Sequence, residues 1–144
     1  MNGKWLMGGL LGFTAIFAVG LWYAQFYAFY SEIEAEGVEI AGRIYPVTGF
    51  EGIDATTSPL KLRACFTLPE APDAPSYPRA EPLVAPGWFD CFDAEALARA
   101  LAAGEAQAFL AASGEYDGTE RVVLRFPDGR AYMWRQLDER FAEQ

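Results

Sequence analysis

The sequence RVVLRFPDGRAYMWRQL, residues 121–137, carries the clearest structural signal in the chain. Apolar and polar residues alternate on both sides of Pro127-Asp128-Gly129-Arg130, and this tetrapeptide supplies turn chemistry. Alternation with a period of two is typical of half-buried strands, so the stretch predicts a β-hairpin. We therefore expect an antiparallel sheet.

Two more strands are predicted upstream of this hairpin. Apolar residues alternate over residues 38–44 and again over residues 60–66, which predicts two half-buried strands. The alternating apolar residues are Val38, Ile40, Ile44, Leu60, Leu62, Ala64 and Phe66, and the last four are interleaved with Lys61, Arg63 and Cys65. Residues 50–59 between them are expected to form a loop.

A short helix is predicted after these strands. Asp93 is placed to cap a helix over residues 94–103, and Gly104 follows its end. Residues 107–112 are too few for hydrophobic periodicity to assign them to a helix or a strand. The tail after Leu137 is expected to be poorly ordered. Because helix and strands are mixed without βαβ regularity, the pattern indicates a small α+β domain on an antiparallel sheet.

The first thirty residues differ from this domain. From Trp5 to Tyr30 no residue is charged, and 20 of the 26 positions are hydrophobic. A run of this length predicts one transmembrane helix over residues 5–30, with some tilt. The alternative is a cleaved secretory signal, because residues 18–20 have the small-x-small pattern of a cleavage site. The apolar stretch of a signal is usually about 7–15 residues long, so the longer run favours a retained anchor.

Charges that flank the span predict its orientation. Lys4 precedes the span, and no basic residue follows it before Arg43. The positive-inside rule then places residues 1–4 in the cytoplasm and residues 31–144 outside. Four glutamates follow the span: Glu32, Glu34, Glu36 and Glu39. In a Gram-negative bacterium the expected location is the inner membrane, single-pass, with the C-terminal domain in the periplasm.

The span has two features beyond its apolarity. Gly8, Gly12 and Gly20 share one stripe of the helix, and glycines at this spacing let another helix approach closely. Glycine is also common in transmembrane helices, so chance is the competing interpretation. Aromatic residues crowd the outer end, where an interfacial belt explains most of them and some are candidates for contact with a partner. The candidates for partner contact are Trp22, Tyr23, Phe26 and Tyr27.

Composition excludes several classes of function. The chain has no histidine and only two cysteines, which excludes catalytic triads with histidine, haem ligation by histidine and zinc sites of the Cys/His type. Its net charge is −9, and residues 31–144 hold all 20 acidic and ten of the 11 basic residues. Nucleic acid is therefore not an expected partner, because phosphate binding needs a basic surface.

The two cysteines predict a structural disulfide. In an oxidising compartment Cys65 and Cys91 have only one intramolecular pairing, and their spacing is not that of a redox-active Cys-x-x-Cys pair. The Pro-rich loop over residues 68–87 lies between them. It holds Pro69, Pro72, Pro75, Pro78, Pro82 and Pro86. The spacing favours a polyproline-type segment outside the core, and a recognition strip for a partner is the alternative.

Motifs for nucleotides, hydrolytic nucleophiles and haem attachment are missing from the sequence. Two acidic clusters remain, Asp90, Asp93 and Glu95, then Glu115, Asp117 and Glu120. Helix capping and turn formation explain them better than a carboxylate enzyme or a calcium site does. The aromatic residues Trp88, Phe89 and Phe92 are expected to cover the disulfide. We therefore expect no catalytic residue, no metal and no cofactor.

Three blocks carry a resemblance to a known group of proteins. They are Ser58-Pro59-Leu60-x-x-Arg63-Ala64-Cys65-Phe66, then Pro86-Gly87-Trp88-Phe89-Asp90-Cys91-Phe92-Asp93-Ala94, then Arg121-Val122-Val123 with Pro127-Asp128-Gly129-Arg130. Behind an N-terminal anchor, these blocks resemble an uncharacterised family of small single-pass proteobacterial membrane proteins. The resemblance implies a bacterial host, but it supplies no activity, catalytic residue or cofactor to carry over to this chain.

These patterns favour a non-catalytic accessory subunit of an integral membrane complex. We expect an electron-transfer complex of the respiratory or photosynthetic kind, such as a cytochrome oxidase or a bc1 complex. Its expected partners are integral membrane subunits, the lipid bilayer and a basic periplasmic protein such as cytochrome c, which an acidic surface attracts. The alternative is a free-standing, membrane-anchored factor for envelope assembly or folding.

Overall fold

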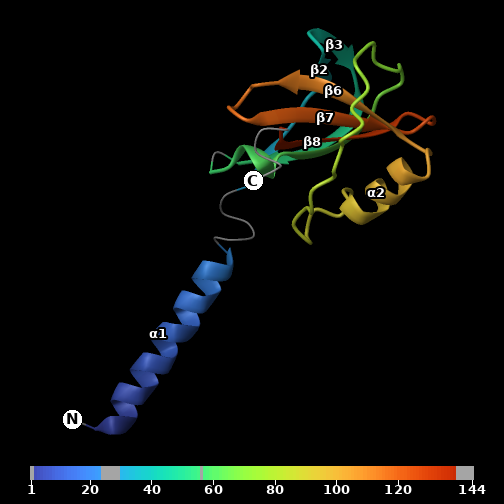
Figure 1. Ribbon diagram of the computed structural model, residues 1–144. Coiled ribbons are helices and arrows are strands. Elements are labelled where there is room, and N and C mark those ends of the chain that lie inside the picture. The colour runs from blue at the N-terminus through green and yellow to red at the C-terminus, as the bar shows by residue number, and fades with distance from the viewer. Residues whose placement is uncertain (1, 24–29, 56, 139–144) are drawn as a thin grey trace. The chain divides into compact units, whose positions relative to one another are not determined.

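The structure is a computed structural model that describes residues 2–23, 30–55 and 57–138. The chain divides into two compact units, Met1–Tyr30 and Ser31–Gln144. The first contains a single described helix, and the second contains a β-sheet domain with one α-helix (Figure 1).

Helix α1, Gly3–Tyr23, has no buried residue. Its 21 residues, at a rise of 1.5 Å each, give a length of about 32 Å, close to the thickness of the hydrocarbon core of a bilayer. Among the described residues, α1 is the one helix that is long and apolar enough to cross a membrane. The expected anchor over residues 5–30 includes residues 24–29, which lie outside the described residues.

A six-stranded antiparallel sheet forms the second unit, in the order β1-β4-β5-β8-β7-β6. Its strands are β1 (Ser31–Ile33), β4 (Thr48–Asp54), β5 (Arg63–Thr67), β6 (Gln107–Ser113), β7 (Thr119–Arg125) and β8 (Arg130–Leu137). The expected fold class, α+β with an antiparallel sheet behind an N-terminal apolar helix, is confirmed.

Strands β7 and β8 form the hairpin that the sequence predicts. Val122 pairs with Trp134 across it. At the turn, the N–H of Phe126 donates to the carbonyl oxygen of Arg130 at 2.8 Å. Gly129 has a φ of +98°, a conformation that glycine adopts without steric cost. The local sequence signal is therefore sufficient for this element.

One face of the sheet is covered by a second hairpin, β2 (Gly37–Ile40) and β3 (Arg43–Pro46). Ala64, Met133 and Val123 are paired side by side on neighbouring strands, so they share this face. They form a buried cluster with residues of the hairpin and its flank. The hairpin and its flank contribute Val38, Ile40, Tyr45 and Val47.

The opposite face is covered by helix α2, Ala94–Ala102, and by the chain that leads to it (Figure 1). Asp93 caps α2 by accepting a hydrogen bond from the N–H of Ala96 at 3.1 Å. Leu97 and Ala100 are its buried residues, and Gly104 beyond its end has a φ of +74°. The predicted helix and its cap are confirmed.

The single strand predicted over residues 38–44 is wrong, because these residues belong to the hairpin β2–β3. Ala41 and Gly42 have φ values of +53° and +85° and form the two residues of its turn. The turn reverses the chain inside the predicted strand. Ile44 is consequently 72% exposed, whereas Tyr45 is buried.

The loop predicted over residues 50–59 is also wrong in its first half. Strand β4 occupies this region and pairs with both β1 and β5. A Cβ at Gly52 would lie 2.6 Å from the Phe50 ring and 2.8 Å from the Ile33 side chain. Gly52, the glycine of this stretch, therefore serves close packing inside a sheet.

Strand β5 begins later than predicted, because Pro59–Lys61 forms a short 3-10 helix whose N-cap is Ser58. Arg63 and Cys65, expected on a polar face, are both buried because β5 lies inside the sheet with both faces covered. Residues 107–112, which the sequence leaves unassigned, belong to β6.

The Pro-rich segment, residues 68–87, is fully described and contains no helix or multi-residue strand. It crosses the edge of the sheet beside β6, where the N–H of Tyr77 donates to Ala108 and the N–H of Leu110 donates to Pro75, both at 2.9 Å. Figure 1 shows this yellow-green segment crossing strands β6, β7 and β8. The expectation that it lies outside the core is wrong at Leu68 and Tyr77, which are both buried, and Leu68 belongs to the core cluster.

Candidate functional site

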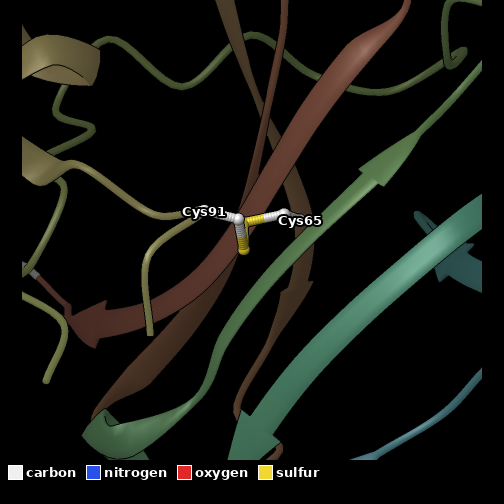
Figure 2. Close-up of a disulfide and its surroundings, with 2 residues drawn as sticks. All are labelled: Cys65 and Cys91. Atoms are coloured by element: carbon white, nitrogen blue, oxygen red, sulfur yellow. A yellow bond between two sulfur atoms is a disulfide. The ribbon is translucent and has the colours of Figure 1, made fainter. Parts of the chain in front are cut away.

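A disulfide joins Cys65 on β5 to Cys91, which follows the Pro-rich segment (Figure 2). Their Cα atoms are 6.3 Å apart, within the range that disulfides span. Because β5 is an inner strand, the bond fixes the chain around Cys91 to the middle of the sheet rather than to its rim. The pairing that the sequence predicts is present.

Aromatic rings surround this attachment point. Phe92, next to Cys91 in the chain, is buried and makes edge-to-face contacts with Tyr132 and Trp134, with ring centroids 6.1 and 6.0 Å apart. Trp88 and Phe89 form a further edge-to-face pair. Edge-to-face pairs are a favoured arrangement of aromatic rings, so this packing holds the segment on the sheet.

Buried side chains also hold the Pro-rich segment. Proline has no N–H to donate, so the prolines of this segment cannot take part in a regular β-ladder. The carbonyl groups of the segment therefore need hydrogen-bond donors from elsewhere in the domain. Arg63 donates to the carbonyls of Leu83 and Val84, both at 3.0 Å, and the amide of Gln136 donates to the carbonyl of Arg79 at 2.9 Å. The roles of Arg63 and Gln136 are not evident from the sequence, because alternation alone does not reveal which strand is covered on both faces.

A cavity opens beside the disulfide and is the best candidate for a binding site. Its volume is about 400 Å³, and β1, β4 and residues 88–91 line it. The lining includes the apolar side chains of Phe50, Ile53, Trp88 and Phe89, and the carboxylates of Glu32, Glu34, Glu51 and Asp90. Cys91 also lines it, so the disulfide positions one wall.

The cavity carries a strong negative charge. All four carboxylate side chains belong to exposed residues, and none of the described lining residues is a lysine or an arginine. The structure gives none of these carboxylates an ion pair with a described residue. From the sequence, Glu32 and Glu34 indicate orientation, Asp90 flanks a helix start and Glu51 is expected in a loop. Their convergence is not evident there, because the three segments are far apart in the chain.

The second acidic cluster has a structural role. Glu115 accepts hydrogen bonds from Arg121 at 2.9 Å and from Arg135 at 3.4 Å, and Arg135 also contacts Asp54 at 3.3 Å. Arg121 is buried, so Glu115 compensates a charge inside the domain. Within the described part of the chain, no group of three or more His, Cys, Asp or Glu residues is arranged to hold a metal ion.

The glycine stripe of α1 is open. A Cβ at Gly8, Gly12 or Gly20 would meet no atom within 4 Å. Of the aromatic candidates for partner contact, Trp22 and Tyr23 are 52% and 57% exposed. The other two, Phe26 and Tyr27, lie outside the described residues.

Together, the fold and these features define a small α+β domain that is cross-linked by one disulfide and follows an apolar N-terminal helix. The chain belongs to a family of unknown function, DUF6446, whose model matches residues 35–144. The match covers almost all of the sheet domain. No curated protein and no solved structure is significantly similar to the chain.

Proposed function

We propose that this protein is a non-catalytic accessory subunit of an integral membrane complex. In this proposal α1 anchors it in a bacterial inner membrane as a single span, and residues 31–144 form a periplasmic domain. The carrying observation is that α1 has no buried residue and presents Gly8, Gly12 and Gly20 with no neighbouring atom within 4 Å. Small residues at this spacing are the contact surface that transmembrane helices use for close packing.

The sheet domain supports a binding role more than a catalytic one. Two of its buried polar side chains, Arg63 and Gln136, bind the protein's own backbone. One open feature of the described domain is the acidic cavity beside the disulfide. An acidic domain attracts basic partners over distances of the order of a Debye length, about 10 Å at 0.1 M salt.

Among membrane complexes we propose an electron-transfer complex of the respiratory or photosynthetic kind, such as a cytochrome oxidase or a bc1 complex. The support is the charge of residues 31–144, which hold 20 acidic and ten basic residues and therefore carry a net charge of −10. A domain of this charge favours the approach of a basic carrier such as cytochrome c.

The test compares two neighbouring glycines of α1. Gly8 lies on the stripe, and Gly9 lies about 100° around the helix from it, although both have open surroundings. We expect the wild-type chain and Gly9→Leu to co-purify with stoichiometric membrane subunits in a mild detergent, and Gly8→Leu to lose them. Native electrophoresis and mass spectrometry give the readout. A wild-type chain that migrates alone would contradict the proposal.

A free-standing factor for envelope assembly or folding is the second candidate. A groove of about 530 Å³ lies between the Pro-rich segment and α2, and Val84 on its wall is 83% exposed. A client bound there transiently would co-purify in substoichiometric amounts. Replacement of α1 by an unrelated transmembrane helix then preserves function, whereas the subunit proposal expects loss.

A further inference from the structure

The two edges of the six-stranded sheet are treated differently by the rest of the chain. At the β6 edge, the N–H of Leu110 donates to Pro75, the N–H of Tyr77 donates to Ala108 and the N–H of Ala41 donates to Ala111. The chain therefore covers this edge itself. Such cover is a common way to stop edge strands from pairing with other chains.

The opposite edge, β1, lacks this cover in the described residues. Ser31, Glu32 and Ile33 pair with Asp54, Ile53 and Gly52 of β4, and β1 is the last strand of the sheet. No backbone hydrogen bond joins β1 to a described residue outside β4. An edge strand of this kind is a template for an added strand.

The acidic cavity lies at this same edge. Glu32, Ile33 and Glu34 line it from β1 and its end, so side chains of a strand added beside β1 on the same face as Glu32 would extend toward the cavity. Side chains of an added strand alternate between the two faces, with the same period as those of β1. Alternate side chains of the added strand would therefore meet the carboxylates.

The lining chemistry selects the charge of the occupant. Carboxylates from three segments, Glu32, Glu51 and Asp90, line the cavity together with Trp88. A lysine or arginine side chain gains from the carboxylates and from the face of an aromatic ring, whereas an acidic side chain is repelled. The volume of about 400 Å³ is in the range of pockets that bind small groups, large enough for a side chain.

We propose that the cavity at the β1 edge binds a short, extended, basic segment of a partner polypeptide, which adds as a strand beside β1. The backbone of β1 supplies hydrogen bonds, and the carboxylates and Trp88 select lysine or arginine at alternate positions. This inference rests on the proposed function, because it supplies the place where the domain holds a partner polypeptide.

The test uses the full chain in micelles of a neutral detergent and a fluorescent peptide of four Val-Lys repeats. Binding is followed by fluorescence anisotropy at about 50 mM salt, where screening is weak. The probe is compared with a Val-Glu peptide and with a Val-Lys peptide whose alternate amides are N-methylated. We expect the Val-Lys peptide to bind, the Val-Glu peptide not to bind, and N-methylation to weaken binding at least tenfold.

Matched variants separate the cavity from the general charge of the domain. Glu32→Gln with Glu51→Gln removes two cavity carboxylates, and Glu39→Gln with Glu105→Gln removes two exposed carboxylates elsewhere. We expect the double variant at Glu32 and Glu51 to weaken binding about five- to tenfold, which corresponds to the loss of two exposed ion pairs. The control double variant at Glu39 and Glu105 should weaken it less than twofold. Trp88→Leu is expected to weaken binding about twofold or more while it keeps an apolar wall.

Three results overturn the inference: no binding of the Val-Lys peptide, equal loss in both double variants, or no effect of N-methylation. Co-purification through α1 is measured separately. If Gly8→Leu abolishes co-purification while the double variant at Glu32 and Glu51 leaves peptide binding unchanged, the inference fails and the proposed function stands. If the peptide binds as expected but the wild-type chain has no stoichiometric partner, the proposed function fails instead.

Discussion

The guanidinium Nε of Arg63 donates a hydrogen bond of 3.0 Å to the backbone carbonyl oxygen of Leu83, twenty residues further along the chain. The same group also donates to the carbonyls of Leu60, Leu62 and Val84. One buried cation on an inner strand therefore satisfies acceptors in two separate segments. It connects the middle of the sheet to the Pro-rich segment just before the chain reaches Cys91.

We expect Arg63→Met to lower the free energy of unfolding by about 3 kcal/mol. The substitution keeps an apolar stem but leaves buried carbonyls without their donor, and an unsatisfied buried group costs about 1–3 kcal/mol. Urea denaturation followed by tryptophan fluorescence measures the loss. Arg99→Met is the matched control, because it removes the same charge from an exposed pair with Glu95 and should change stability by less than about 0.5 kcal/mol. Equal effects of the two substitutions would contradict the role of Arg63.

Gln136→Leu is expected to destabilise the domain by about 2–3 kcal/mol. Oε1 of Gln136 accepts from the N–H of Glu81 at 2.8 Å and from the indole N–H of Trp134 at 3.0 Å, and its Nε2 donates to the carbonyl of Arg79. Leucine has a similar volume and none of these groups. Differential scanning calorimetry of Gln136→Leu and of the exposed Gln107→Leu gives the comparison. A melting temperature that falls equally in both would contradict this prediction.

Elements with a complete local signal were predicted correctly. The hairpin 121–137 has its turn residues between two alternating runs, and α2 has its cap at Asp93. Strand β4 was not predicted, because Gly49 and Gly52 interrupt the alternation of apolar residues that is typical of a strand. The need for glycine at position 52 follows only from the packing of Phe50 and Ile33 against it. The turn at Ala41 was missed because alanine rarely adopts a positive φ.

The candidate site was less predictable than the fold. The pairing of Cys65 with Cys91 follows from counting cysteines, and the structure contains that bond. The cavity brings together β1, β4 and residues 88–91, and no pattern within one segment reveals such a convergence. Arg63 was assigned to a polar face because the sequence pattern does not reveal that β5 is an inner strand between β4 and β8.

Loss of the disulfide is expected to cost about 3–4 kcal/mol, because it closes a loop of about 27 residues. A reductant should therefore lower the urea midpoint of the wild-type chain and leave that of Cys65→Ala with Cys91→Ala unchanged. In cells, a membrane-impermeant thiol reagent should label the two cysteines only after reduction. Labelling without reduction would contradict the bond, and no labelling even after reduction would contradict the proposed export of the domain. A wild-type midpoint insensitive to reductant would contradict the energetic role alone.

Tyr77 is expected to give the domain a stability that depends on alkaline pH. Burial is the largest cause that raises its pKa, from 10.0 to about 12, and a hydrogen bond and charge interaction with Glu120 act in the same direction. Since the pKa in the folded state exceeds that in the unfolded state, the folded state favours the protonated phenol. This contribution is complete below about pH 10 and is lost as the pH rises through about 12.

The measurement is the free energy of unfolding between pH 9 and pH 12 for the wild-type chain and for Tyr77→Phe. Phenylalanine does not ionise, so the variant should lose less stability over this interval although it starts lower, because it lacks the contact of Tyr77 Oη with Gln136. Tyr116→Phe is the control, since its side chain is exposed. An absorbance titration should show one phenol fewer ionising near pH 12 in Tyr77→Phe. Parallel pH profiles for the wild-type chain and Tyr77→Phe would show that another group causes the alkaline loss.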